Sequence, residues 1–127
     1  MKVVHYEDVS SAPVEMDGAA GCRIRTLIGP EDQAPHFSMR QFEVSPEGHT
    51  PRHRHGHEHE VFVLEGSGVV VQADMEHPIE SGTVVFVPPN VEHQFRNTGS
   101  GPLKFLCLIP SAVGHGSGGC ADAGGCH

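Results

Sequence analysis

The stretch that decides the fold is Pro51–Gly66, PRHRHGHEHEVFVLEG, in which four histidines stand at every second position before an apolar run. Residues two apart in a β-strand point to the same side of the sheet. The odd-numbered positions therefore predict imidazoles on one side at the start of a strand, and Val61 and Val63 on the same side further along. Polar ligands at one end and apolar residues at the other indicate a barrel with a metal site inside. Gly56 interrupts the pattern and is expected to mark a bend or bulge.

Composition limits the classes of function open to the chain. Its 127 residues suffice for one domain with a core and are too few for two. Lys and Arg number 8 against 16 Asp and Glu, and the formal net charge of -8 repels phosphate backbones and anionic lipid heads. We therefore expect neither nucleic acid nor a membrane as a partner.

The opening residues and the cysteines indicate the compartment. Residues 1–18, MKVVHYEDVSSAPVEMDG, include acidic residues and lack a continuous apolar run, which predicts neither a signal peptide nor a membrane span. The 4 cysteines are too few and too unevenly placed for a disulfide framework, so they are expected to be thiols in a reducing compartment. These features predict a cytoplasmic protein.

Short apolar segments separated by Gly, Pro and Asn recur along the chain and predict an all-β fold of antiparallel hairpins. No ten-residue stretch shows a helical period. The pattern predicts an N-terminal strand and loop over 1–22, a sandwich or barrel over 23–112, and a flexible Gly-rich tail over 113–127. The expected strands are VVHYEDV (3–9, an edge strand), RIRTLIG (23–29), FSMRQFEV (37–44), HEVFVLEG (59–66), GVVVQAD (68–74), TVVFVPP (83–89), HQFRN (93–97) and LKFLCLIP (103–110).

The histidine stretch resembles the first motif of the cupin superfamily, which reads Gly, five residues, His-x-His, three or four residues, Glu, six residues, Gly. His53 and His55 take the His-x-His positions, and Gly66 fixes the register. Seven residues before Gly66 stands His59, where the family most often has glutamate. Four residues separate Gly48 from His53, where the family has five.

A later segment resembles the second cupin motif, which reads Gly, five residues, Pro-x-Gly, two residues, His, three residues, Asn. Gly82, Pro88, His93 and Asn97 match it in order and spacing. Asn90 replaces the third-position glycine of the Pro-x-Gly turn, and asparagine also tolerates a positive φ there.

The resemblance implies a cupin β-barrel, the double-stranded β-helix or jelly roll of antiparallel strands, with one metal site. Within the superfamily, the chain is similar to small single-domain cupins in which four histidines bind the metal, a group with manganese-containing members. One divalent transition metal is implied: the resemblance favours Mn, whereas imidazole ligands also suit Fe, Cu, Ni and Zn. The implied ligands are His53, His55, His59 and His93.

Four neutral imidazoles would leave a divalent ion with its full charge, which favours an anionic substrate or a strongly acidified bound water. Around an octahedral ion they would also leave two positions open. One alternative within the site gives Glu60 the carboxylate role in place of His59. His57 stands between ligand positions at the expected bend and is not expected to be a ligand. Glu58 and Glu60 have the opposite parity from His59 and are expected to be solvated or paired.

Substrate-binding residues are expected beside the histidines. Phe95 shares the parity of His93, and Phe105 and Cys107 lie on one face of KFLCLIP, where they form a pocket wall or ordinary core. Arg40 is a candidate for a bidentate clasp on a carboxylate, or a surface arginine. The tail offers further possible metal ligands, namely His115, Cys120, Cys126 and His127.

These observations predict a metal-dependent oxygenase or related oxidoreductase that acts on a small organic substrate. The alternatives are non-redox isomerase, decarboxylase or lyase chemistry, and a module that binds a metal or small ligand without turnover. The resemblance also implies a homodimer. Phe62 and Leu64, which point away from the metal side, suit packing against a second layer or a second subunit.

Overall fold

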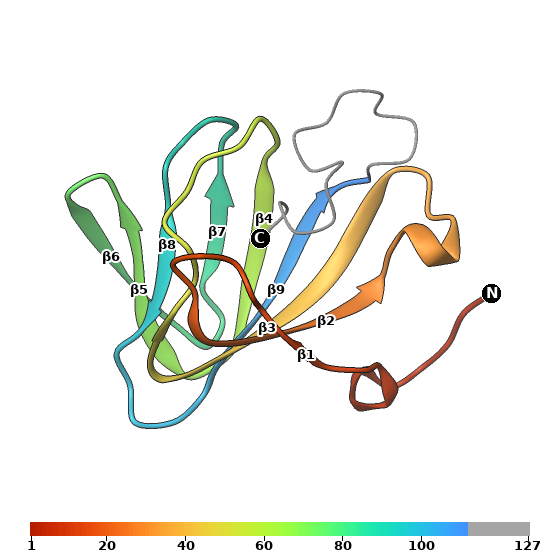
Figure 1. Cartoon of the computed structure of the whole chain (residues 1–127), viewed down its shortest axis with the longest axis horizontal. Helices are drawn as coiled ribbons and strands as arrows, with labels where there is room; N and C mark the ends of the chain where they lie inside the picture. The colour runs from red at the N-terminus through yellow and green to blue at the C-terminus, as the bar shows by residue number, and fades with distance from the viewer. Residues whose placement is uncertain (112–127) are drawn as a thin grey trace.

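Nine antiparallel strands form one sheet that curls around a central core (Figure 1). The computed structural model describes residues 1–111. The sheet order is β6-β5-β8-β3-β9-β4-β7, and β2 pairs with both β3 and β1. The strands are β1 (Ala12–Pro13), β2 (Ala20–Ile28), β3 (Phe37–His49), β4 (His59–Glu65), β5 (Ser67–Gln72), β6 (Met75–Glu80), β7 (Val84–Val87), β8 (Gln94–Asn97) and β9 (Leu103–Pro110), with 3-10 turns η1 (Tyr6–Asp8) and η2 (Pro30–Asp32).

The all-β antiparallel fold expected from the sequence is confirmed, and each segment predicted as a strand between residues 23 and 110 overlaps an observed strand. The edge strand expected at residues 3–9 is wrong, because η1 occupies Tyr6–Asp8 instead. The His5 side chain accepts a hydrogen bond from Glu7 N at 3.2 Å and caps this turn. The strand β6 was not predicted, because only Ile79 of its residues is buried and Pro78 lies within it.

The core lies inside the curl and is built from alternate residues of the strands. Along β9 the residues Leu103, Phe105, Cys107 and Ile109 are buried, while those between them are half-buried. Burying a Leu or Phe side chain contributes about 1.5–3 kcal/mol each. The core cluster is Cys22, Phe42, Val44, Val61, Val63, Val70, Ile79, Phe95, Leu103, Phe105, Cys107 and Ile109.

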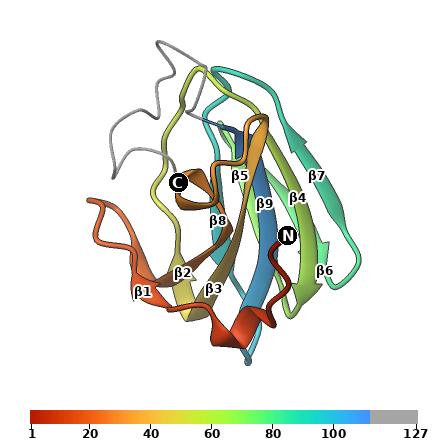
Figure 2. The ribbon, with the colours of Figure 1, turned by 90° about the vertical axis from the view of Figure 1, so that its right-hand side faces the viewer.

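The strand β4 follows the predicted parity. His59, Val61 and Val63 are buried, whereas Phe62 and Leu64 on the opposite face are 46% and 42% exposed. Viewed from the side, β3, β9, β4 and β7 lie next to one another as one wall of the fold (Figure 2). On β4 and β7 the outward side chains Phe62, Leu64, Val84 and Phe86 are exposed, whereas Gln41 of β3 is buried.

Two residues of the second motif, Asn90 and Asn97, stabilise turns and strand ends of the backbone. Asn90 has φ 65°, which confirms the positive φ expected where the second motif has glycine. Asn97 Nδ2 donates to Val44 O and to Gly101 O, each at 2.8 Å, and its Oδ1 accepts from Gly99 N at 2.8 Å. Asn97 thus ties the end of β8 to β3 and to the turn that follows.

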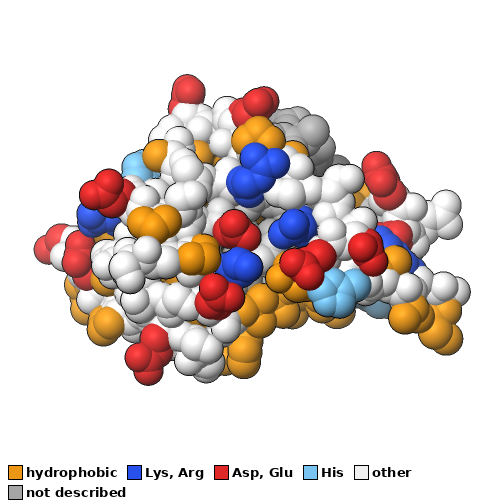
Figure 3. Space-filling view, turned by 90° about the horizontal axis from the view of Figure 1, so that it is seen from below, with side chains coloured by type: hydrophobic (Ala, Val, Ile, Leu, Met, Phe, Trp, Pro, Cys, Tyr) orange, Lys and Arg blue, Asp and Glu red, His pale blue; other side chains and the backbone are white. Residues whose placement is uncertain are grey.

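Charged side chains are scattered over the surface. On the face in Figure 3, acidic and basic groups are interspersed among hydrophobic ones, and the described residues form no continuous basic patch there. Within residues 1–111, no helix is both long enough and apolar enough to cross a bilayer.

The cytoplasmic location and the domain boundaries expected near residues 22 and 112 stay predictions. The tail expected at residues 113–127, with His115, Cys120, Cys126 and His127, lies outside the described residues.

Gly66 provides a test of the turn between β4 and β5. Its φ is +90°, and a Cβ there would lie 2.3 Å from Pro102 O and 2.9 Å from Leu103 Cα. Gly82 has nearly the same φ, +91°, but a Cβ there would meet nothing within 4 Å. Gly82→Ala should therefore lose only about 1–2 kcal/mol of unfolding free energy, the cost of a positive φ in a residue with a Cβ.

We expect Gly66→Ala to lose as much unfolding free energy as Gly82→Ala, plus about 1–3 kcal/mol for displacing the Pro102–Leu103 backbone. Urea denaturation of both variants and the wild type measures the difference. Equal losses for the two variants would contradict a close approach of the backbone at Gly66.

Candidate metal centre

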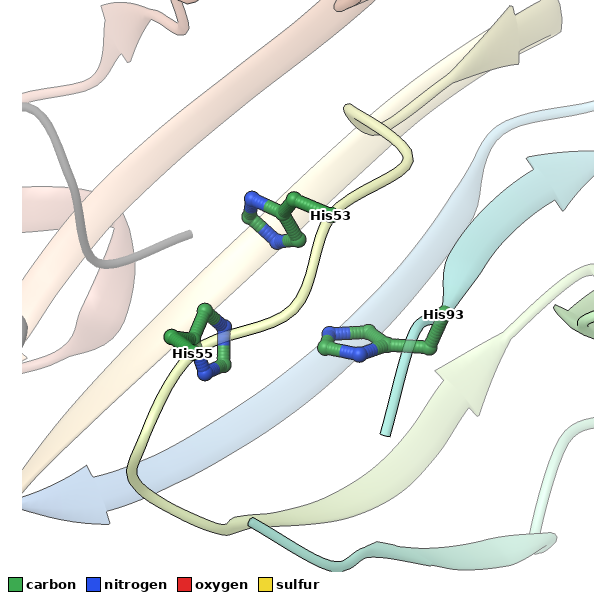
Figure 4. A group of neighbouring side chains, drawn as sticks. All are labelled: His53, His55 and His93. Carbon is green, nitrogen blue, oxygen red and sulfur yellow. The ribbon is translucent and has the colours of Figure 1, made fainter. Parts of the chain in front are cut away.

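Four of the five histidines of the site come from one segment that bends into the barrel. His53 and His55 lie in the loop between β3 and β4, with a bend at Gly56 and His57, and His59 opens β4. His93 lies just before β8, and Figure 4 shows its ring directed toward His53 and His55. The bend expected at Gly56 is confirmed, and the four odd positions therefore do not lie on one regular strand.

A short backbone pairing holds the two segments together. His53 N donates to His93 O at 3.2 Å, and His93 N donates to His53 O at 3.0 Å. This antiparallel bridge places both side chains at the same mouth of the barrel (Figure 4). Asn90 N also donates to His55 O at 2.7 Å, which ties the turn of the second motif to the histidine loop.

The four predicted ligands lie together. The ring centroids of His55 are 4.8 Å from those of His53, 5.2 Å from His93 and 4.5 Å from His59. The centroid of His93 lies 5.1 Å from that of His53 and 5.1 Å from that of His59. His53, His55 and His93 each offer a donor nitrogen within 4.8 Å of the others, a spacing that could hold one ion.

His57, which the sequence pattern set aside, also joins the cluster. Its ring stacks on that of His55 with centroids 3.9 Å apart and an interplanar angle of 2°. His55, His57 and His59 form a second possible group of three ligands. The shared odd spacing of these histidines was the available signal, but the bend at Gly56 concealed which rings would meet.

Hydrogen bonds at Nδ1 fix which ring nitrogen of His55 and of His93 can serve as a metal ligand. His55 Nδ1 lies 3.2 Å from His57 O, and His93 Nδ1 lies 2.9 Å from Val91 O. A carbonyl oxygen only accepts, so both Nδ1 atoms carry the proton and both Nε2 atoms keep a lone pair. Metal-binding histidines are commonly oriented in this way.

Burial keeps the cluster neutral. His59 and His93 are 2% and 4% exposed, and burial lowers the pKa of both imidazoles below the ordinary 6.5. For His59 the charge of Arg40 lowers the pKa further. Burial, followed by the charges of His55, Arg40 and His93, lowers the pKa of His57 to about 4. These rings are therefore in the unprotonated form that binds metals at neutral pH.

The predicted substrate residues lie directly behind the histidines. Phe95, Phe105 and Cys107 line a small interior cavity together with His53, His59 and His93. The volume of that cavity is about 10 Å³, room for about one water molecule. Arg40 is 4% exposed, and its Nη2 donates to Cys107 Sγ at 3.3 Å, so it is a buried arginine rather than a surface one.

A larger space opens beside His93. A pocket of about 340 Å³ lies between β5–β6 and β7, the two ends of the curled sheet, and His93 forms part of its wall. Apolar side chains of Val70, Ile79 and Val91 line it together with His77. This pocket has the size of a site for a small organic molecule.

Glu60 points away from the cluster. It lines a groove on the outer face with Phe62, Phe86 and Leu108. Burial, and then the hydrogen bond and charge of Glu58, raise its pKa to about 7. The geometry thus favours His59 over Glu60 as the residue that faces the other histidines.

The donor set fits a divalent transition metal. His55 Nε2 and His59 Nε2 are 2.8 Å apart, close to the about 3 Å expected for two nitrogens at right angles on an ion with bonds of about 2.0–2.1 Å. Two lone pairs at this distance repel each other unless a proton or a cation lies between them. Among the described residues, both candidate ligand groups consist of histidine alone.

Comparison with known proteins agrees with this architecture. Residues 40–109, more than half of the chain, match the Cupin domain family. The structure of the polyketide cyclase RemF from Streptomyces resistomycificus superposes with a TM-score of 0.82 at 38% identity, covering 87% of this chain and 79% of that one.

Two curated relatives match over a shorter stretch. The chain is 35% identical over 71 residues to 1-methylthio-D-xylulose 5-phosphate methylsulfurylase of Rhodospirillum rubrum, covering 56% of this chain and 46% of the relative. It is 41% identical over 71 residues to glucose-6-phosphate isomerase of Pyrococcus abyssi, covering 51% and 38%. The matched region thus spans less than half the length of these two relatives.

The lowered pKa of His59 predicts how pH affects the stability of the metal-free protein. Below about pH 6.5 the unfolded chain protonates this histidine while the folded chain does not, so stability falls by up to about 1.4 kcal/mol per pH unit as the pH decreases. His59→Gln removes one such group, and its unfolding free energy should fall less steeply between pH 6.5 and 5. Urea denaturation in the presence of a chelator measures both slopes.

Two features make this comparison specific. Glu60, with its raised pKa, acts with the opposite sign by losing stability as the pH rises toward about 7, but it is present in both proteins. Phe95→Leu should lower stability at every pH without changing the slope, because it removes no titrating group. A His59→Gln slope equal to that of the wild type would contradict a neutral buried His59.

Proposed function

This chain belongs to the cupin family, and from that premise we propose that it is a metal-dependent enzyme whose ion is held by His53, His55, His59 and His93. The observation that carries the proposal is the convergence of imidazoles from two segments distant in sequence, with His55 Nε2 and His59 Nε2 2.8 Å apart. We propose Mn as the ion on the basis of the resemblance, with Fe, Cu, Ni and Zn also suited to imidazole.

We propose non-redox chemistry on a small carbonyl compound as the reaction class. When bound, the ion supplies a Lewis acid that polarises a carbonyl or phosphoryl oxygen. The relatives that support this class are named as a polyketide cyclase, a glucose-6-phosphate isomerase and a methylsulfurylase acting on a sugar phosphate. Neutral imidazoles leave the ion's charge uncompensated, which favours an anionic or enolisable substrate.

The chain's own residues supply binding and exclusion of water. Phe95 and Phe105 close the interior behind the histidines, and the 10 Å³ cavity there is too small for an organic substrate. We therefore assign the body of the substrate to the 340 Å³ pocket walled by His93 and His77. Val70, Ile79 and Val91 would hold its apolar part.

A metal-dependent oxygenase, the first expectation from the sequence, is the second candidate. It is favoured by the donor set, since imidazoles suit the redox-active ions Fe and Cu. Dioxygen uptake in the presence of a substrate would support the oxygenase. Deuterium exchange from solvent into sugar phosphates or β-keto acids, without dioxygen uptake, would support the non-redox class. Tight binding of a small ligand with neither deuterium exchange nor dioxygen uptake would indicate a binding module without turnover.

Elemental analysis of the purified, untagged protein tests the site itself. We expect near-stoichiometric transition metal in the wild type and in His77→Ala, which lies in the pocket but outside both ligand groups. His59→Ala should lose most of the metal, because the substitution removes one of the four neutral imidazole ligands.

His53→Ala and His57→Ala separate the two possible ligand groups. We expect the first to lose metal and the second to keep it, because the proposed set includes His53 and excludes His57. The reverse result would move the ion to the group formed by His55, His57 and His59. A wild-type protein that contains no metal after growth in metal-supplemented medium would contradict the proposed metal site.

We also propose that the chain forms a homodimer through the outer face of the wall formed by β3, β9, β4 and β7. A groove of about 350 Å³ runs over this face, and apolar side chains line it almost entirely. Phe62, Val84 and Phe86 are 46%, 71% and 60% exposed there, and a cluster of exposed apolar side chains is a common mark of an interaction surface.

Sedimentation of charged variants tests this interface. The wild type should sediment as a dimer, and Phe62→Lys with Phe86→Lys should sediment as a monomer because two charges would be buried at the contact. Met75→Lys is the control, since Met75 is also exposed but lies on β6, outside this wall. A monomeric wild type at micromolar concentration would contradict the proposal.

A further inference from the structure

Three buried side chains form a row behind the histidine cluster. Arg40 of β3, Cys107 of β9 and His59 of β4 lie on adjacent strands, where Cys107 is the cross-strand partner of both Arg40 and Val61. His59 precedes Val61 by two residues and so lies on the same face, diagonally across from Cys107. The three side chains are 4%, 2% and 2% exposed, so water does not compete for their hydrogen bonds.

The contacts run in one line from the arginine to the cluster. Arg40 Nη2 donates to Cys107 Sγ at 3.3 Å, and Cys107 Sγ lies 2.7 Å from His59 Nδ1. His59 Nε2, on the other side of the ring, faces His55 Nε2 at 2.8 Å. A guanidinium has no acceptor, so the sulfur already accepts one hydrogen bond from the arginine.

His59 differs from two of its neighbours in what lies at Nδ1. Backbone carbonyls accept from Nδ1 of His55 and of His93, and each leaves Nε2 directed to the cluster. At His59 the corresponding partner is the sulfur of Cys107. The position of the sulfur therefore matches the position of the two carbonyl acceptors.

We propose that Cys107 is a positioning residue for the metal site: held by Arg40, its sulfur accepts a hydrogen bond from the Nδ1–H of His59 and so keeps Nε2 available as a ligand. The inference rests on the proposed role of His59 as a ligand. It reassigns Cys107 and Arg40 from contact with substrate, expected from the sequence, to the support of one histidine. The ring carries a single proton throughout, and no charge is gained or lost.

The guanidinium of Arg40 contacts both the sulfur of Cys107 and the ring of Phe42. Arg40 Nη2 contacts the sulfur of Cys107, which in turn contacts His59 Nδ1. Its guanidinium lies 5.2 Å from the ring centroid of Phe42, a distance at which the ring face attracts a cation. These two contacts hold the guanidinium where it can orient the sulfur.

The tautomer of His59 in the zinc-loaded protein gives the first readout, because without a cation the lone pairs of His59 Nε2 and His55 Nε2 would face each other at 2.8 Å. Long-range proton–nitrogen NMR correlations on histidine-labelled protein should show His59 protonated at Nδ1 in the wild type and in Cys107→Ser, whose hydroxyl also accepts. In Cys107→Ala the proton should move to Nε2, because no acceptor remains at Nδ1. A packing role alone would not move this proton.

Zinc affinity, measured by competition with a chelating dye, gives the second readout. Loss of such a supporting partner typically lowers metal affinity about 10–100-fold, and we expect this for Cys107→Ala. Cys22→Ala is the matched control: it removes another buried sulfur, one that donates to His49 O at 2.9 Å and lies outside the row. It should lower stability but leave both zinc affinity and the tautomer of His59 unchanged.

The outcomes separate the two proposals. A wild type that binds zinc with His59 protonated at Nε2, or a Cys107→Ala variant that binds zinc with unchanged affinity and an unchanged tautomer, overturns the positioning role and leaves the metal site standing. A wild type that binds no zinc, manganese or iron overturns the proposed metal site, and the positioning role with it.

Discussion

Two backbone hydrogen bonds between His53 and His93 are the constraint on which the site depends. They join the loop before β4 to the segment before β8, parts of the chain that the curled sheet brings to the same mouth (Figure 4). Without this bridge the His53–His55 loop would be an exposed connection with freedom to move. With it, three imidazoles share one small volume, and His59 is added by the pairing of β4 with β9.

Electrostatics makes this volume unusual for a protein interior. Imidazoles, a buried arginine and a thiol lie side by side, and the described ligand groups include no carboxylate. Burial lowers the pKa of His59 and His93, so the rings are neutral lone-pair donors instead of cations. A divalent ion is the natural complement of such a cluster, and its charge would then draw an anionic or enolisable substrate toward the pocket beside His93.

Much of the fold could be predicted from the chain because its signals are local. Alternation in HEVFVLEG and LKFLCLIP placed His59, Val61, Phe105 and Cys107 on the buried face, as observed. The positive φ at Asn90 followed from turn chemistry. The strand β6 was missed because most of its residues are exposed, and the edge strand expected at residues 3–9 was wrong because a local cap at His5 stabilises a 3-10 turn.

The sequence by itself determined the all-β fold and which histidines have the type and spacing of metal ligands. Only the tertiary structure decided that His57 stacks on His55 and that Arg40 reaches the site through Cys107. The physical reason is that these contacts depend on the register of β3, β9 and β4 and on the bend at Gly56. Periodicity shows which face a residue occupies, but a residue's neighbour on the adjacent strand is set by pairing between distant segments.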